Sequence, residues 1–525
     1  MISDGDEQHS SDSRAKPKGR AAGINKREFL GGTLAAAVAP PALAKSAKGL
    51  RHRAPGRRNL LILTVDDMDV SAMGYMGNTH GLTPNLDRLA ARSHIFINNR
   101  GAAPICMPSR QAFMSGLVPH RNSPGGFTPM YEGVQSICSI LHREGWFCAA
   151  SHKTEHMQPQ SSFPWDYRVD SNDRNVLDHQ IAFNAAVALA KAAGRPVFIN
   201  CNINDPHRPF YGSARAAERD HDDQGPYRVP NPVGPADVEV PPFLEDLPDI
   251  RLELAQYWNS VQRADIAIGR VLKGLQESGQ ADNTVIIFCN DHGMPFPYSK
   301  ATAYDHGTRV PALVCYPGMG APQRFGDLAS NVDIMPTVLD LLGVAVPDGI
   351  DGRSWVPRME GRRVPERAFV ATYVNGVDNG TIYATRAIQD QRFLLIYQPW
   401  SDGELKLHVD SMTGLSFATM QSAAQADRRI AERVRNYQFG VPVSFFDLLA
   451  DPGQRSNLIH DPRHQARIAN MRDALLREME RTRDPQLANI RTMLAGGKPV
   501  VVQPEHKGRR YHMQIQAHGS PPAAA

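Results

Sequence analysis

The sequence has no long uninterrupted apolar run and little cysteine. No segment approaches the roughly 18 consecutive apolar residues of a membrane-spanning helix, so we expect no membrane span. Six cysteines in 525 residues are too sparse for a disulfide scaffold. Cys201, Cys289 and Cys315 lie in apolar, strand-like runs and are predicted core residues. Whether Cys138 pairs with Cys148 stays open.

The chain also lacks a strong charge of one sign. Its formal net charge is only +4, although its pI is about 8.7. Residues 1–58 contain 12 Lys and Arg against five Asp and Glu, which leaves 46 basic and 49 acidic residues for the rest. The positive balance therefore belongs to the N-terminal segment, and we expect no nucleic-acid partner. With 42% apolar residues, the chain is not of the disordered class.

The first 44 residues are predicted to form an export signal. Lys26-Arg27 precedes a short apolar run over 31–39, and Ala42-Leu43-Ala44 has the A-x-A form of a signal-peptidase site. The pattern resembles a twin-arginine signal with Lys in the first position, which predicts a bacterial protein that is periplasmic or secreted. The alternative is an Ala-rich tail. Residues 45–58 are then a basic, flexible arm.

Four apolar runs are typical of buried parallel strands, and each is followed by polar side chains. They cover residues 60–65, 146–150, 196–203 and 284–289, and lead into Asp66-Asp67, His152-Lys153, Asp205-Pro206-His207 and Asp291-His292. In sheets of this kind ligands bind beyond the carboxyl ends of the strands. Convergence of the four ends predicts one polar, metal-dependent active site.

The remaining patterns predict an α/β protein with a smaller C-terminal α+β subdomain. Apolar spacing of 3 and 4 predicts helices over 252–277 and 332–342, each followed by a glycine that suits a helix end. Residues 157–195 and 210–250 are predicted loops. The predicted boundaries are 59–375 for a catalytic domain, 376–494 for a subdomain with a small antiparallel sheet and a helix over 463–482, and 495–525 for a tail.

One motif carries the chemistry. Cys106-Met107-Pro108-Ser109-Arg110 has the form C-x-P-S-R, and with the strand-end residues above it resembles the type I sulfatases of the alkaline-phosphatase-like superfamily. The resemblance runs from about residue 58 to 462. Further matching elements are Lys300, the run 304–311, the run 333–337 and the late run 446–458. It implies a large mixed, mainly parallel sheet sandwiched by helices.

The resemblance implies that a maturation enzyme oxidises Cys106 to formylglycine. The hydrate of that aldehyde offers one hydroxyl that attacks sulfur and a second whose collapse expels sulfate. A divalent cation is implied as well, Ca²⁺ or Mg²⁺, because the ligands are rich in oxygen. The implied metal ligands are Asp66, Asp67, Cys106, Asp291 and His292. Many relatives carry Asn in place of His292.

By the same resemblance, Arg110 stabilises the hydrate, while Lys153 and Lys300 neutralise sulfate oxygens. His207 is implied to protonate the leaving atom, and His156 to trigger collapse of the hydrate. The family spacing is K-x-H, whereas this chain has one more residue between Lys153 and His156, so His152 competes for the role.

Three further residues are weaker candidates for substrate binding. Arg208 and Arg309 either contact substrate anions or pair with Asp205 and Asp305, and His306 is a candidate for the pocket rim.

Within the family, the residues around the motifs are most similar to those of sulfamidase-like members. This similarity predicts that the substrate is a sulfated carbohydrate and that the bond cleaved is a sulfate ester or a sulfamate. One alternative is a phosphonate monoester or phosphodiester hydrolase of the same superfamily. Another is a non-catalytic protein that binds sulfated glycans.

Overall fold

The computed structural model describes residues 57–171, 173–217 and 224–503. The predicted export signal, most of the basic arm and the end of the tail lie outside these residues. In the described part of the chain, no helix is long and apolar enough to cross a membrane.

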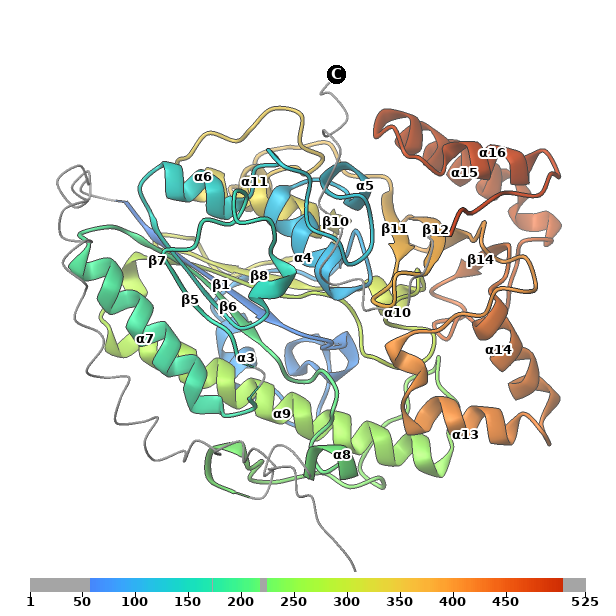
Figure 1. Cartoon of the computed structure of the whole chain (residues 1–525), viewed down its shortest axis with the longest axis horizontal. Helices are drawn as coiled ribbons and strands as arrows, with labels where there is room; N and C mark the ends of the chain where they lie inside the picture. Colours follow the sequence, from blue (N-terminus) through green and yellow to red (C-terminus); the bar gives the residue numbers. More distant parts are fainter. Residues whose placement is uncertain (1–56, 172, 218–223, 504–525) are drawn as a thin grey trace, which may run out of the picture. The chain divides into compact units, whose positions relative to one another are not determined.

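An eight-stranded sheet runs through the larger part of the structure (Figure 1), in the order β5-β4-β6-β1-β7-β8-β2-β9. Strands β5, β4, β6, β1 and β7 are parallel, β8 is antiparallel to β7 and to β2, and β2 is parallel to β9. The strands are β1 (Asn59–Val65), β2 (His94–Phe96), β4 (Phe147–Ser151), β5 (Tyr167–Val169), β6 (Val197–Ile203), β7 (Thr284–Asn290), β8 (Ala312–Cys315) and β9 (Arg324–Phe325). All four strands expected from the apolar runs are confirmed, and the sheet is mixed and mainly parallel.

Helices cover both faces of this sheet, because every second side chain of a central strand faces the other side. In β1, Leu61 and Leu63 belong to one apolar cluster and Leu60 and Ile62 to the other. In Figure 1 one face carries α3 (Pro84–Ala90), α7 (Val176–Ala192) and α9 (Pro248–Glu277). The opposite face carries α4 (Cys106–Ser115), α6 (Ile137–Arg143) and α11 (Ile334–Leu342).

The two clearest predicted helices are confirmed, and one expected loop is wrong. Helix α9 begins with Pro248 in its first turn, a position where the missing N–H costs nothing, and α11 ends at Gly343 in the left-handed conformation. Residues 176–192, expected as part of a loop, form α7. That helix is rich in alanine, and Ile181 and Leu189 lie on its exposed face, so its apolar pattern is not one-sided.

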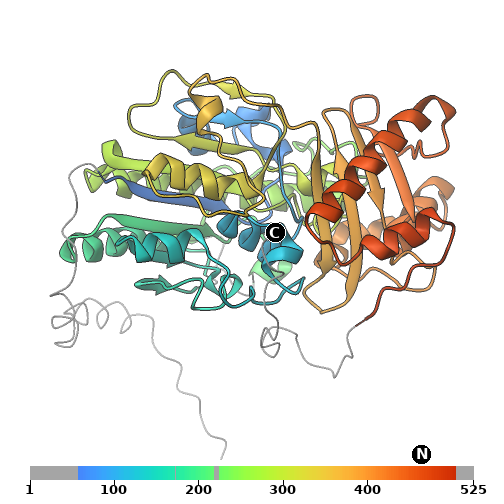
Figure 2. The ribbon, with the colours of Figure 1, turned by 90° about the horizontal axis from the view of Figure 1, so that it is seen from above.

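A second, antiparallel sheet follows in the order β11-β12-β13-β14. Its strands are β11 (Val370–Gly376), β12 (Ile382–Gln389), β13 (Phe393–Tyr397) and β14 (Val443–Asp447). Helix α15 (Gln465–Arg481) packs on one face of it (Figure 2), with Leu475 and Met479 against Leu395 and Phe445. The small sheet and the late helix agree with expectation, and the boundary at residue 375 stays a prediction.

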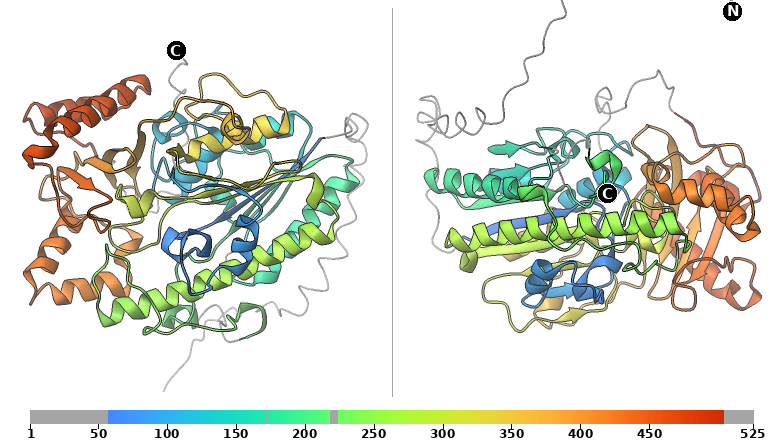
Figure 3. Two further views of the ribbon diagram at one scale, coloured as in Figure 1. Left: turned by 180° about the vertical axis from the view of Figure 1, so that it is seen from behind. Right: turned by 90° about the horizontal axis from the view of Figure 1, so that it is seen from below.

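Helix α9 connects the two regions. Figure 3 shows it crossing beneath the large sheet and reaching α13 (Leu415–Ala423). At that contact the buried carboxylate of Glu253, on α9, accepts hydrogen bonds from the backbone N–H groups of Leu415 and Ser416. The first turn of α13 is thereby fixed to α9.

Candidate functional site

The carboxyl ends of β1, β4, β6 and β7 lie side by side. In the parallel pairing, Val65 at the end of β1 is level with Ile203 of β6 and Asn290 of β7. Ser151 at the end of β4 is level with Cys201. The polar residues that follow these strands therefore meet at one edge of the sheet, as the sequence predicts.

Helix α4 brings the C-x-P-S-R motif to this edge. The helix begins at Cys106, and its first residues are completely enclosed. The Ser109 hydroxyl donates to the backbone carbonyl of Asp291 (2.6 Å) and accepts from the Asn331 amide (3.0 Å). These bonds hold the positive end of the α4 dipole over the end of β7, where an anion is favoured.

Four of the five predicted metal ligands form one cluster. Ligand atoms of Asp66, Asp67, Cys106 and His292 all lie within 4.8 Å of one another, and all four residues are buried. The Cys106 sulfur lies 3.2 Å from Nε2 of His292 and 3.5 Å from Oδ1 of Asp66, and Nδ1 of His292 lies 3.3 Å from Oδ1 of Asp67. Two buried carboxylates beside an imidazole fit a divalent cation that prefers oxygen ligands.

Asp291, the fifth predicted ligand, lies beside this cluster. Its Oδ2 is 3.0 Å from Nη2 of Arg110, and its Oδ1 accepts the backbone N–H groups of Asp67 (3.2 Å) and His292 (3.0 Å). Oδ1 is also 3.7 Å from Nε2 of His292. Asp291 thus ties Arg110 to the backbone that carries the other ligands.

Arg110 depends on a residue that the sequence analysis missed. Its Nη1 donates to Oδ1 of Asn202 (2.5 Å), and the Asn202 amide donates to the carbonyls of Ser151 and His152. Asn202 connects Arg110 to the end of β4. The signal available in the sequence was an amide inside an otherwise apolar strand.

Two lysines neutralise the carboxylates. Nζ of Lys153 lies 2.5 Å from Oδ2 of Asp66, and Nζ of Lys300 lies 2.9 Å from Oδ1 of Asp67. Burial alone would raise the pKa of Asp66, but Lys153, His207 and Arg110 hold it well below its usual range. Burial raises the pKa of Asp67 well above its usual range, and Lys300 only partly offsets this.

The backbone is strained at this edge. Asp67 and Lys153 have positive φ angles of 65° and 53°, a region that residues with a side chain rarely occupy. From this conformation both side chains reach the cluster, Lys153 by pairing with Asp66 and Asp67 as one of its members. Such strain is found preferentially at functional sites.

The extra residue between Lys153 and His156 is accommodated by a short turn. Thr154–His156 form a 3-10 turn in which the backbone N–H of His156 donates to the Lys153 carbonyl. This turn returns His156 to the cavity that Lys153 lines. The competing His152 lies elsewhere, with its buried ring 4.3 Å from that of His179.

His207 is held by the backbone beside it. Its Nδ1–H donates to the Arg208 carbonyl (2.7 Å), which leaves Nε2 facing Oδ2 of Asp67 at 4.0 Å. Arg174 donates to the carbonyls of both His207 and Arg208. Burial, together with Lys300 and Lys153, lowers the pKa of His207 well below its usual value.

The three weaker substrate candidates lie outside the cavity. Arg208 bonds to Glu253 (2.5 Å) and to the Pro295 carbonyl (2.9 Å). Of the two alternatives for Arg208, pairing with Asp205 is wrong, because Asp205 receives two bonds from Arg263.

The ring of His306 stacks on Phe243 at 4.0 Å, and its Nε2–H donates to the Pro452 carbonyl. Arg309 follows the short helix α10 (Asp305–Thr308), and the Asp305 carboxylate pairs with Arg100 at 2.7 Å. Neither His306 nor Arg309 lines the cavity described next.

A cavity of about 220 Å³ opens onto the cluster. Five of the predicted catalytic residues line it: Cys106, Lys153, His156, His207 and Lys300. Its other walls are Ile105, Phe127, Ala301, Val377, Asp378, Val409 and Asp410. The last four belong to the C-terminal region and were missed, because no motif marks them.

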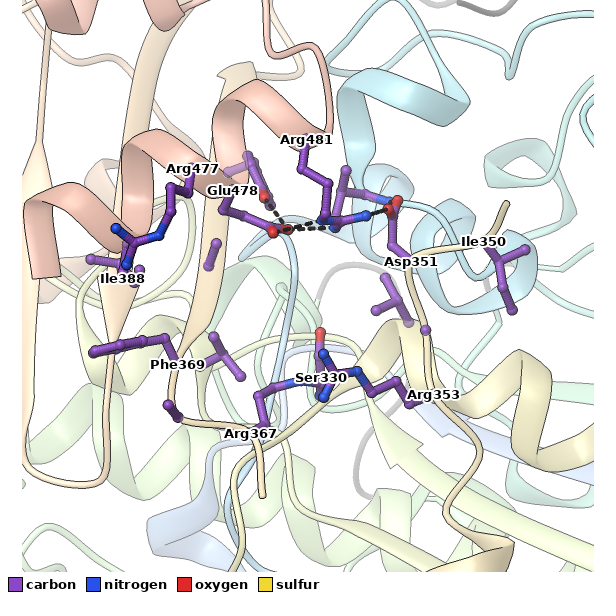
Figure 4. Close-up of a pocket in the computed structure, with 18 of the residues that line it drawn as sticks. Ser330, Ile350, Asp351, Arg353, Arg367, Phe369, Ile388, Arg477, Glu478 and Arg481 are labelled. Carbon is purple, nitrogen blue, oxygen red and sulfur yellow. Dashed lines mark hydrogen bonds and ion pairs between the residues drawn. The ribbon is translucent and has the colours of Figure 1, made fainter. Parts of the chain in front are cut away.

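A larger cavity of about 550 Å³ lies elsewhere, between the region of α5 (Pro119–Asn122) and α15. Figure 4 shows Arg481 bonded to both Glu478 and Asp351 across it. Arg367 makes two bonds to Asp333, at 2.6 and 2.8 Å. These bonds engage Arg481 and Arg367 with acidic partners, and among the residues that the structure describes, the lining of this cavity holds no cysteine, histidine or lysine.

Comparisons with known proteins agree with this geometry. A family model described as "Sulfatase" matches residues 58–344, and one described as "N-sulphoglucosamine sulphohydrolase, C-terminal" matches residues 291–409. The chain is 27% identical to human N-sulphoglucosamine sulphohydrolase over 463 residues, covering 82% of this chain and 91% of the relative.

Solved structures share the fold. A 2-O GAG sulfatase superposes with a TM-score of 0.60 at 19% identity, covering 82% of this chain and 94% of its own. A phosphonate monoester hydrolase from Silicibacter pomeroyi superposes with a TM-score of 0.59 at 18% identity, covering 82% and 97%. At these identities the likeness shows the fold alone.

Proposed function

Because the chain belongs to the sulfatase family, we propose that it hydrolyses a sulfate ester or sulfamate of a carbohydrate, with formylglycine at position 106 and a divalent cation. The observation that carries the proposal is the cavity at the cluster. One small space joins the start of α4, two lysines and two histidines to a buried acidic cluster. These groups suit a reaction in which negative charge develops on sulfate oxygens.

The side chains have separate roles in this proposal. Lys153 and Lys300 neutralise sulfate oxygens, and Arg110 holds the oxidised residue 106 through its position beside Asp291. His207 protonates the leaving oxygen or nitrogen from Nε2 once a bound anionic substrate has favoured its doubly protonated form, since its Nδ1–H is engaged by a backbone carbonyl. His156 accepts the proton that is released when sulfate is expelled.

The metal ligands in this proposal are Asp66, Asp67, residue 106 and His292, with Asp291 adjacent. The cation, Ca²⁺ or Mg²⁺, supplies Lewis-acid polarisation of a sulfate oxygen. The hydrated aldehyde supplies the hydroxyl nucleophile and the second hydroxyl that permits release. A thiol lacks the second hydroxyl, which is why a formylglycine-generating maturation enzyme is a required partner.

We further propose that the protein acts in the periplasm or outside the cell. The support is the twin-arginine-like pattern of residues 26–44 and its A-x-A end. Producing the full chain and sequencing the N-terminus of the exported form tests this. Recovery of the intact leader on protein confined to the cytoplasm contradicts it.

The competing function is hydrolysis of phosphonate monoesters or phosphodiesters, since a hydrolase of that kind has the same fold. The deciding experiment compares kcat/KM for an aryl sulfate, N-sulfoglucosamine and an aryl phosphodiester, using matured protein and the Cys106→Ser variant as control. We expect the sulfated compounds to be preferred and the variant to lose all three activities. A preference for the phosphodiester by several orders of magnitude overturns the proposal. Binding of sulfated sugar without turnover favours the non-catalytic alternative.

A further inference from the structure

The cavity at the candidate site is lined by charges of both signs. Lys153 and Lys300 line it together with Cys106. Asp378 and Asp410 lie among the residues that the C-terminal region contributes. An anionic substrate thus meets two carboxylates as well as the two lysines.

Asp410 is placed to contact the part of a substrate next to its sulfate. Its Oδ2 accepts a bond from Nζ of Lys300 (3.1 Å), and a carboxylate oxygen lies within 4.8 Å of a His207 ring nitrogen. Its side chain is 29% exposed, and Lys300 and His207 hold its pKa below the usual range although burial opposes this. In the part of the chain that the structure describes, no hydrogen bond ends on its Oδ1, so one acceptor of an ionised carboxylate remains for a ligand.

Asp378 lies in the turn between β11 and β12 and is exposed. The turn is closed by the backbone N–H of Val377, which donates to the Thr381 carbonyl. The Asn379 amide donates to the His408 carbonyl (3.0 Å), which ties this turn to the segment that carries Asp410. The two carboxylates therefore belong to one connected piece of the cavity wall.

The size of the cavity limits which substrates it can hold. Its volume of about 220 Å³ is below the roughly 300–1,000 Å³ of pockets for drug-sized ligands. That space suits one sugar ring rather than a stretch of chain. A ring whose sulfate faces the lysines then has its other substituents beside Asp378 and Asp410.

We infer that Asp378 and Asp410 select a sugar unit with a single sulfate, whose neighbouring groups are hydroxyls or an amine. A hydroxyl or amine donates hydrogen bonds to a carboxylate, whereas a second sulfate on the same ring is repelled by it. This inference rests on the proposed function. It adds that the C-terminal region sets selectivity by excluding a second negative charge.

The test compares kcat/KM for glucosamine 2-N-sulfate and glucosamine 6-O-sulfate with that for glucosamine 2-N,6-O-disulfate. Matured wild type is compared with Asp378→Asn, Asp410→Asn and the double variant. Glu404→Gln is the matched control, because Glu404 is an exposed acid of the same region that does not line the cavity. We expect wild type and control to prefer the better monosulfate by about tenfold or more, and the double variant to lose most of that preference.

The other outcomes overturn either the inference alone or both proposals. An unchanged preference in an active double variant overturns the inference and leaves the proposed function standing. If the wild type hydrolyses the disulfate at least as well as either monosulfate, the inference is likewise overturned and the proposed function stands. If Asp410→Asn fails to fold, the exposed Asp378→Asn still has to lower the preference, and a preference equal to that of wild type overturns the inference. Wild type with verified formylglycine that releases sulfate from none of the three sugars overturns both proposals.

Discussion

The sulfur of Cys106, at the start of α4, lies 3.2 Å from Nε2 of His292, and both residues are buried. Burial and the carboxylate of Asp66 raise the pKa of the Cys106 thiol well above its usual value. A neutral thiol is a poor nucleophile. The position therefore suits a metal-contacting residue whose reactivity comes from chemical modification rather than from an ionised thiol.

Metal removal is predicted to lower stability as well as activity. A cation held by Asp66, Asp67 and His292 binds the folded state, so an ion concentration 100 times its Kd stabilises the fold by about 2.7 kcal/mol. The measurement is the thermal unfolding midpoint in EGTA, in EDTA with Mg²⁺, and with added Ca²⁺. Asp67→Asn is expected to shrink the shift caused by the ion. An identical midpoint with and without every divalent cation contradicts the proposed site.

The choice between His156 and His152 can be tested directly. His156 lines the cavity and His152 packs on His179, so His156→Ala is expected to lower kcat by about 100-fold or more. His152→Asn is expected to change kcat far less, although the loss of a buried ring lowers its stability. Steady-state kinetics on folded protein, checked by circular dichroism, give both values. A larger loss of kcat in His152→Asn would reverse the assignment.

The buried pair of Arg386 and Asp484 is predicted to be a main structural contact of the C-terminal region. The two side chains make two bonds, at 2.5 and 2.8 Å, and neither is exposed. Arg386→Ala leaves a buried carboxylate without its partner, which costs about 3–5 kcal/mol of unfolding free energy. Urea unfolding measures the change.

Glu480→Gln is the control for that experiment, because Glu480 pairs with Arg491 and both side chains are exposed, by 50% and 58%. We expect no measurable change in this variant, since exposed ion pairs contribute little. Equal effects in the buried and the exposed variant would contradict the structural role of Arg386.

Stability is predicted to fall between pH 6.5 and pH 4. Burial lowers the pKa of His120 to about 4, so the unfolded chain binds more protons than the folded one in this window. Stability from this residue is therefore complete above pH 6.5, declines as the pH falls, and reaches its lowest value below pH 4, a loss of about 3 kcal/mol.

The measurement is urea unfolding across that pH range for wild type and His120→Gln. The variant is expected to show a flatter dependence, with the remaining slope due to other groups such as His152. The same slope in both proteins would contradict the assignment to His120.

The large-scale fold and the cavity residues that follow the strands could be predicted because both leave local patterns. Strands such as Leu60–Val65 are continuous apolar runs, and the residues that follow them lie next to one another once the strands are parallel. Short strands such as β2 and β9 leave no such run. Helix α7 was missed because its exposed face is also apolar, which weakens the one-sided pattern that predicts a helix.

The cavity residues of the C-terminal region could not be predicted, for a different reason. Asp410 is more than 300 residues from Cys106 in the chain, and only folding places it beside Lys300. Arg208 shows that residues close in the sequence need not pair in space. Its neighbour Asp205 in the sequence looked like its partner, but Glu253 on α9 is the partner in space. Proximity in sequence says little about pairing between long side chains.

The most direct test of the account is the mass of the tryptic peptide that contains position 106, after production together with a formylglycine-generating enzyme. The account predicts that the thiol is converted to an aldehyde, with loss of the sulfur and two hydrogens and gain of one oxygen. A Cys315→Ser protein, altered at a cysteine outside the cavity, is expected to give the same peptide. Recovery of only the unmodified Cys106 thiol in protein that hydrolyses sulfate esters would contradict the account.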